Sequence, residues 1–131
     1  MGSRTPAVSR RVILVDTPVW IDHIRRPIGP LCELLEVNQI EVHPFVIGEI
    51  SLGNIGRDFL AELKRLPLVI SASHDEVMSL IDRASLAGSG VGYVDAHLLA
   101  STRLTTGRLL WTRDRRVRAV AERLSIDAGL D

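Results

Sequence analysis

The stretch VILVDTP, residues 12–18, decides the fold of this chain. Its first four residues are an unbroken apolar run rich in β-branched side chains, which is typical of a strand buried on both faces. The run stops at Asp16, and Thr17-Pro18 is the pattern of an N-cap followed by the first residue of a helix. A buried strand that leads directly into a helix predicts an α/β fold.

The rest of the sequence repeats this alternation of short apolar runs and helical segments. We expect further strands at residues 40–42, 66–70 and 108–111, and a short edge strand at 125–126. We expect helices at residues 31–37, 44–52, 57–66, 75–86, 93–104 and 115–124, the fourth of them opened by a capping box of Ser73 and Glu76. Strands that alternate with helices through short loops predict a parallel sheet flanked by helices.

The composition fits one domain of ordinary globular character. The chain has 131 residues, 46% of them apolar and 24% charged, and its formal net charge is zero. We expect a disordered N-terminal extension over residues 1–11, one domain over residues 12–131, and a cytoplasmic protein, because no apolar run approaches the ~20 residues that cross a bilayer. A single cysteine, Cys32, excludes an internal disulfide and a multi-cysteine zinc site. A neutral chain binds a polyanion only through local charge.

Four acidic residues are the candidates for chemistry. Asp16 and Asp114 follow the ends of two expected strands, where the active crevice of an open parallel sheet lies. Glu49 has apolar neighbours at helical spacing, so we expect it to face inward, and Asp95 lies in the first turn of its helix. Each acid also has a structural interpretation: Asp16 and Asp114 as helix caps, Asp95 as a first-turn acid, and Glu49 as the partner of a buried arginine.

If the four acids lie close together in the fold, their carboxylates form one negative site. Two carboxylates 4 Å apart repel by about 4 kcal/mol at moderate dielectric. A hard divalent cation removes that repulsion and prefers oxygen ligands. Magnesium or manganese held by carboxylates, with water retained, is a common means of hydrolysing a phosphodiester bond.

The motifs around these acids resemble those of PIN-domain ribonucleases, and among them the VapC-type toxins of bacterial toxin–antitoxin pairs. They are DTPVWID at 16–22, IGEI at 47–50, YVDA at 93–96 and TRD at 112–114, in the order and spacing of that family. The resemblance covers nearly the whole chain from Val12 onward. It implies a three-layer α/β/α domain with a central parallel sheet of four to five strands, which cleaves RNA with Mg²⁺ or Mn²⁺.

The resemblance also implies roles for individual residues and partners. Asp16, Glu49, Asp95 and Asp114 would be the catalytic and metal-binding quartet, with Asp16 and Asp95 as the preferred direct ligands and Thr17 and Thr112 in support. The family implies a cognate antitoxin protein in the active-site groove and a homodimer of toxin subunits. Some relatives carry a further acid where this chain has Arg116, which makes a second tightly held metal doubtful.

Other signals leave alternatives open. Arg113, Arg115 and Arg116 suit a phosphate grip or a solvated helix face. The glycine-rich segment 88–92 follows a helix rather than a strand, so it is not a dinucleotide-binding loop. The four histidines lack metal-ligand spacing, which favours structural or surface roles. The rival functions are a catalytically silent PIN-like module that binds RNA or protein, and a phosphate-transfer receiver or phosphatase, which usually needs a lysine after a later strand.

Overall fold

The centre of the molecule is a parallel sheet, and the structure, a computed structural model, describes residues 11–131. Strand β1 (Val12–Val15) lies between β2 (Ile40–Glu41) and β3 (Arg108–Trp111), and both neighbours run parallel to it. In this register Ile13 lies opposite both Ile40 and Leu109. The α/β fold with a parallel sheet is therefore confirmed, and the apolar run at residues 12–15 is its central strand.

The expected number of strands is wrong, because the described residues form a sheet of three strands rather than four or five. The segments 66–70 and 125–126 do lie at the two edges of the sheet, but each is reduced to a single parallel bridge. Leu68 pairs with Val42 on one side, and Asp127 pairs with Leu110 on the other. One bridge leaves most backbone groups of an edge segment without a ladder partner, so neither segment is a regular strand.

Seven helices surround the sheet in the described part of the chain. They are α2 (Thr17–Arg25), α3 (Gly29–Glu36), α4 (Pro44–Leu52), α5 (Arg57–Lys64), α6 (His74–Arg83), α7 (Tyr93–Leu104) and α8 (Arg115–Arg123). The bounds of α4 and α7 and the capping box of Ser73 and Glu76 are as expected. The expected N-cap of α2 is wrong by one position: Asp16 caps the helix and Thr17 is its first residue.

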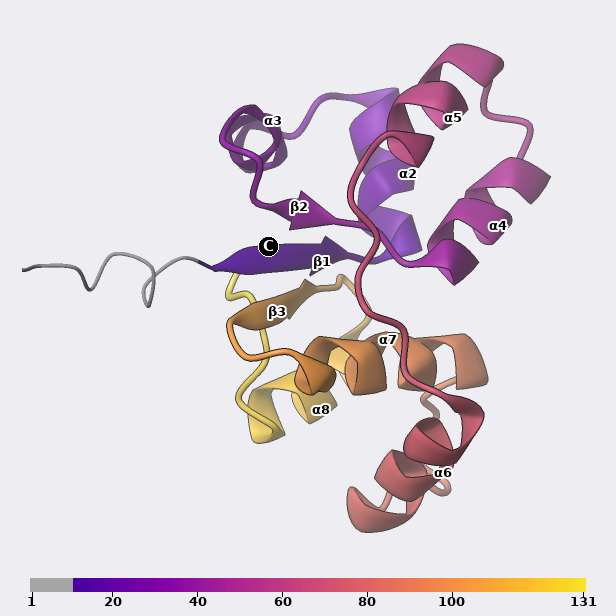
Figure 1. Cartoon of the computed structure of the whole chain (residues 1–131), viewed down its shortest axis with the longest axis vertical. Helices are drawn as coiled ribbons and strands as arrows, with labels where there is room; N and C mark the ends of the chain where they lie inside the picture. The colour runs from indigo at the N-terminus through magenta and orange to yellow at the C-terminus, as the bar shows by residue number, and fades with distance from the viewer. Residues whose placement is uncertain (1–10) are drawn as a thin grey trace, which may run out of the picture.

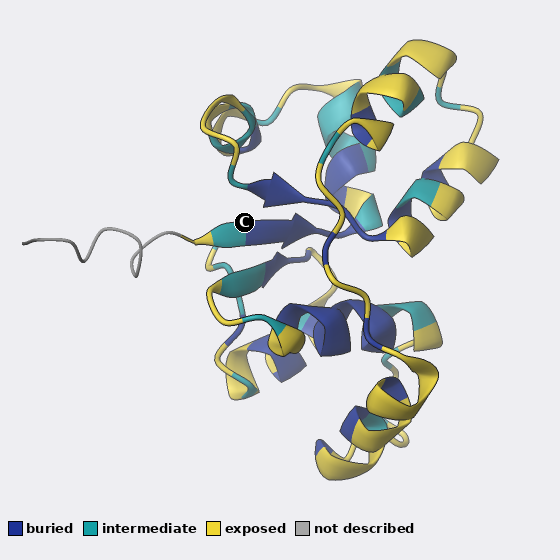
Figure 2. Ribbon diagram, in the orientation of Figure 1, coloured by how far each residue is buried: buried dark blue, intermediate teal, exposed yellow. Residues whose placement is uncertain are grey.

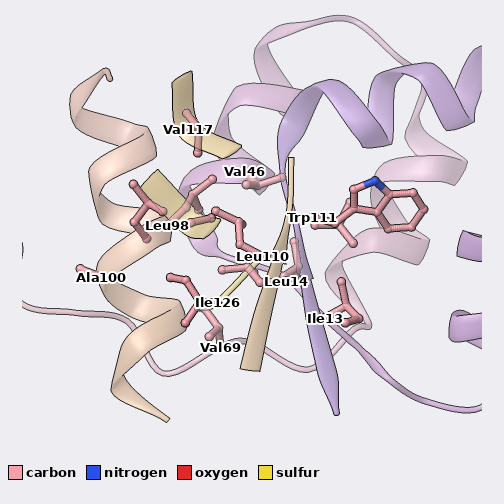
Figure 3. Packing of buried hydrophobic residues seen from close by; sticks show 14 of the residues in the cluster. Ile13, Leu14, Val46, Val69, Leu98, Ala100, Leu110, Trp111, Val117 and Ile126 are labelled. Atoms are coloured by element: carbon pink, nitrogen blue, oxygen red, sulfur yellow. The ribbon is translucent and has the colours of Figure 1, made fainter. Parts of the chain in front are cut away.

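The helices form two groups with the strands between them (Figure 1). Helices α2 to α5 lie on the side of β2, and α6 to α8 lie on the side of β3. The strands and the inner helix faces are buried, whereas the outer faces are exposed (Figure 2). Leu14 and Leu110 are fully buried and meet Leu98 of α7 in the core (Figure 3). Burying such apolar side chains is the main stabilising term of the fold.

One ion pair crosses the sheet. Arg108 of β3 donates two hydrogen bonds to the carboxylate of Glu41 in β2, from Nε to Oε1 at 3.1 Å and from Nη2 to Oε2 at 2.8 Å. Because β1 lies between these strands, the pair reaches across it and joins both outer strands. The guanidinium satisfies a carboxylate that is only 11% exposed.

Two expectations concern regions beyond the sheet. Except for Arg11, the expected extension over residues 1–11 lies outside the described residues, so the division into an extension and one domain stays a prediction. Within residues 11–131, none of the helices has the length and apolar character that crossing a membrane requires.

Candidate active site

Asp16 is the most buried of the four acids, with 3% of its surface exposed at the carboxyl end of β1. Oδ1 accepts a hydrogen bond from the Thr17 backbone N–H at 2.8 Å, which begins α2. Oδ2 accepts a hydrogen bond from the Thr112 hydroxyl at 2.9 Å, just beyond β3. Asp16 therefore does serve as a helix cap, and the same carboxylate is held at the edge where two parallel strands end.

The environment of Asp16 favours its protonated form. Burial raises its pKa from the ordinary value of 3.8 to about 6, and the negative charges of Asp95 and Glu49 act in the same direction. The hydrogen bonds from Thr112 and Thr17 oppose this rise. Two supporting threonines thus stabilise a carboxylate that its burial destabilises.

Glu49 lies on α4 and is exposed, so the expectation of an inward-facing glutamate is wrong. The apolar neighbours misled the prediction, because Phe45 and Leu52 of the same helix are themselves exposed, by 40% and 90%. Glu49 is nevertheless fixed toward the site: the Thr17 hydroxyl donates a hydrogen bond to Oε1 at 2.6 Å. This contact joins α4 to the start of α2, directly beside Asp16.

Asp114 is exposed and caps α8 after β3. Its Oδ1 accepts hydrogen bonds from the backbone N–H of Arg116 at 2.8 Å and of Val117 at 3.1 Å. Its own backbone N–H donates to the Thr112 hydroxyl at 3.1 Å, the same hydroxyl that donates to Asp16. Thr112 therefore connects the two acids that follow the strands.

Asp95, in the first turn of α7, interacts electrostatically with each of the other three acids. Burial raises its pKa, and so do the charges of Asp114 and Glu49, while a backbone hydrogen bond at Gly92 lowers it. Because Asp95 and Glu49 also act on Asp16, each of the four carboxylates lies within electrostatic range of at least one other. The arrowheads of β1 and β3 point toward the side where α4 and the start of α7 lie (Figure 1).

The acids converge without forming a closed ligand set. Within residues 11–131, no three histidine, cysteine, aspartate or glutamate side chains are grouped so that they could hold a metal ion. Each of Glu49, Asp16 and Asp114 has an oxygen taken by a protein donor, and like charges keep the carboxylates apart. Oxygen donors of net negative charge suit Mg²⁺, which is bound by one or two carboxylates and keeps several waters. The chemistry of the set fits such an ion, with water completing its coordination.

The neighbouring arginines differ in how they are engaged. Arg113 is paired with Asp22 at 2.7 Å and donates to the backbone oxygen of Asp131. Arg115 and Arg116 are exposed and have no ion pair among the described residues. The guanidinium of Arg116 passes over Gly90, where a β-carbon would come within 2.7 Å of its Cδ. Of the three predicted phosphate-binding arginines, two have guanidinium groups available.

A row of rings beside the acids was missed by the sequence analysis, which treated the histidines one at a time. Phe45 and His97 have ring centroids 4.6 Å apart, and so do His97 and Tyr93. His43 follows on Phe45 at 4.9 Å, and His74 accepts or donates a hydrogen bond at 2.9 Å with the Tyr93 hydroxyl. We call these five residues the aromatic row. The spacing of Tyr93 and His97, four positions apart on one helix, was the available signal.

The hollows of the surface lie elsewhere. One of about 380 Å³ is lined by Arg103, Gly107 and Asp127 among others, and one of about 480 Å³ by Pro30, Leu34 and others. Neither is lined by any of the four acids.

Comparison with known proteins gives two curated relatives, and no family profile matches the chain. Each relative is named Ribonuclease VapC32, one from Mycobacterium tuberculosis strain CDC 1551 / Oshkosh and one from strain ATCC 25618 / H37Rv. Each is 47% identical to this chain over 113 residues, and the match covers 82% of this chain and 89% of the relative.

Proposed function

Because this chain belongs to the VapC family of PIN-domain ribonucleases, the toxins of toxin–antitoxin systems, we propose that it cleaves RNA internally at its four acids with Mg²⁺ or Mn²⁺. The observation that carries the proposal is the electrostatic coupling of the carboxylates at the carboxyl end of the sheet. Burial raises the pKa of Asp16 and of Asp95, and the charges of neighbouring carboxylates raise it further, so the ionised forms of both acids are costly. Functional sites are where such costs concentrate.

The roles follow from burial and hydrogen bonding. Asp16 and Asp95, the two acids with raised pKa, would hold the cation directly, and Glu49 and Asp114 would hold it directly or through water. When bound, the cation polarises the phosphate and makes an attacking water more acidic at neutral pH. The Thr17 hydroxyl engages Oε1 of Glu49, which leaves Oε2 to orient a water. Thr112 fixes the distance between the segments that carry Asp16 and Asp114.

The arginines after β3 supply the local positive charge that a neutral chain needs. Arg115 and Arg116 would bind phosphates of the RNA backbone, since their guanidinium groups are exposed beside Asp114. Arg113 would contribute its charge, and it would contact phosphate only by giving up Asp22. The arginines before and after Asp114 would thus bind the RNA backbone beside the acids that hold the metal.

The partners proposed for this chain follow from its family. A cognate antitoxin would cover the acids and block access to RNA, and two copies of the chain would form a homodimer. Light scattering on the purified chain tests the dimer, and co-purification with the product of the neighbouring reading frame tests the antitoxin. A monomer at micromolar concentration would contradict the homodimer.

The experiment compares Asp16→Asn and Asp95→Asn with the unsubstituted chain. End-labelled single-stranded RNA is incubated with each protein in Mg²⁺, in Mn²⁺ and in EDTA, and the products are resolved on a gel. We expect the unsubstituted chain to cleave the RNA internally in Mg²⁺ or Mn²⁺ and not in EDTA. We expect each variant to lose at least 100-fold in cleavage rate, because metal-assisted chemistry lowers the barrier by several kcal/mol. Asp58→Asn, also a first-turn acid and exposed, is the matched control and retains activity.

The same series separates a nuclease from a silent module. Titration with Mg²⁺ raises the thermal midpoint of the unsubstituted chain, because an ion that binds only the folded state stabilises it. Asp95→Asn removes most of that rise and Asp58→Asn none of it. A chain that binds RNA but shows neither cleavage nor a response to metal is a silent PIN-like module, and this outcome would overturn the proposal.

A further inference from the structure

The aromatic row ends in two exposed rings that buried rings hold in place. Phe45 is 40% exposed and Tyr93 is 49% exposed, whereas His97 between them is 6% exposed and His43 is 1% exposed. His97 meets Tyr93 edge to face, with an interplanar angle of 84°. Tyr93 keeps about half of its surface exposed beside this contact, and both exposed rings pack against rings that are buried.

Burial disfavours a positive charge on the buried members of the row. Nδ1 of His43 accepts a hydrogen bond from the Phe45 backbone N–H at 2.9 Å, so the proton of the neutral ring lies on Nε2. That Nε2 is buried without a partner in the described part of the chain, and so is Nε2 of His97. Burial lowers the pKa of both histidines. The exposed members of the row, Phe45 and Tyr93, carry no positive charge, and they present aromatic faces to a ligand.

The row adjoins the acids. Phe45 and Glu49 are four positions apart on α4, so their side chains are neighbours on one face of the helix. Tyr93 begins α7, two positions before Asp95. Helix α4 and the start of α7 lie on the same side of the molecule, beyond the ends of the strands (Figure 1). A nucleic-acid backbone that crosses the acids therefore passes close to two exposed rings.

We propose that the aromatic row is a stacking site for an unpaired base of the RNA, on the flank of the acids that Glu49 borders. The proposal rests on the proposed ribonuclease function and adds to it a base contact at two named rings, Phe45 and Tyr93. Every base has a π face, and stacking on an exposed aromatic ring is the common way to hold single strands. In a duplex the bases already stack on each other, so a paired segment cannot use this site.

The test measures binding rather than cleavage. The probe is a ten-nucleotide RNA with one 2-aminopurine, whose fluorescence is quenched by stacking, titrated with the full chain in EDTA. We expect quenching on binding by the unsubstituted chain, and weaker quenching and a Kd roughly 5- to 100-fold higher for Tyr93→Ala. Tyr93→Phe keeps the ring and binds within about twofold of the unsubstituted chain. Leu104→Ala, at the other end of α7 and 40% exposed, is the matched control and changes nothing.

Two further arms make the result decisive. Tyr93→Leu keeps apolar surface without a π face, and Phe45→Leu does the same at the other ring. If both bind and quench the probe as the unsubstituted chain does, the row is general apolar surface of the kind that a protein partner covers, and the proposal fails. It fails as well if the chain does not quench the probe, or if a duplex of the same sequence binds equally well.

The failure of this inference and that of the ribonuclease function are distinguishable. A chain that cleaves RNA in Mg²⁺, while Tyr93→Ala leaves quenching and Kd unchanged, is a nuclease without a stacking site here. A chain that cleaves nothing, while Tyr93→Ala abolishes quenching, has the stacking site without the reaction. A thermal midpoint for each variant confirms that the compared proteins are folded.

Discussion

Removing the charge of Asp16 is expected to stabilise the fold while it abolishes activity. In Asp16→Asn the amide oxygen still accepts the hydrogen bond that caps α2, and the amide nitrogen can donate to the Thr112 hydroxyl. The substitution therefore keeps both hydrogen-bond partners, and the bond with Thr112 reverses its direction. What it removes is a negative charge that is 97% withdrawn from solvent, since only 3% of the residue is exposed.

The magnitude follows from the pKa of this carboxyl. A rise from 3.8 to about 6 on folding corresponds to about 3 kcal/mol of destabilisation when Asp16 is ionised. Because the folded state binds the proton more tightly than the unfolded state, stability falls as pH rises from about 4 to about 6 and stays lowered above that range. Asparagine does not titrate. Its advantage is therefore absent below about pH 4 and complete above about pH 6.

The assay is thermal unfolding in EDTA at pH values between 4 and 8, with Asp58→Asn as the control. At roughly 3 to 4 °C per kcal/mol for a chain of this size, the thermal midpoint of Asp16→Asn exceeds that of the unsubstituted chain by up to ~10 °C at pH 8. The two midpoints approach each other toward pH 4. Two thermal midpoints that differ by the same amount at every pH would refute the reasoning. In that case the midpoint of the variant changes between pH 4 and pH 8 by the same margin as that of the unsubstituted chain.

Three further predictions concern other contacts. Thr112→Val removes the hydroxyl that lowers the pKa of Asp16, so we expect a loss of about 2 kcal/mol in urea unfolding and a metal-dependent cleavage profile shifted to higher pH. Gly90→Ala places a side chain at a φ of +87° and pushes the Arg116 side chain away. The backbone strain lowers the free energy of unfolding by about 1 kcal/mol. In the double variant with Arg116→Ala the collision is relieved and only the cost of the backbone strain is left. Ser73→Ala breaks the capping box of α6 and lowers the free energy of unfolding by about 1 kcal/mol.

Local sequence predicted the elements whose causes are local. The apolar run at residues 12–15 is buried because it is the central strand of a sheet that lies between two groups of helices (Figure 1). Helix α7 has the expected bounds because Gly92 precedes it and its inner face is apolar. The edge segments at 66–70 and 125–126 failed as strands, since an edge strand depends on a ladder with a distant neighbour. The apolar residues of these segments indicate that they pack against the core, but they do not determine how many backbone hydrogen bonds the segments form.

The candidate site was predictable as a set of acids and not as a geometry. The four positions are spread along the chain, and the motifs around them identify the set. That Glu49 is exposed and tied to Thr17 depends on the angle between α4 and α2, which no spacing encodes. The aromatic row escaped for a similar reason, because His97 of α7 meets Phe45 of α4 across about fifty positions of sequence.

The order of the strands determines when the candidate site can form during synthesis of the chain. Among the described residues the first strand to be synthesised, β1, is the middle one, and its second neighbour, β3, emerges only after helices α2 to α7. Asp16 meets the hydroxyl of Thr112 across 96 positions of sequence. A nascent chain therefore carries its first carboxylate for most of its synthesis without the residues that complete the site. A truncated translation product that ends before β3 lacks Thr112 and Asp114, so we expect it not to cleave RNA.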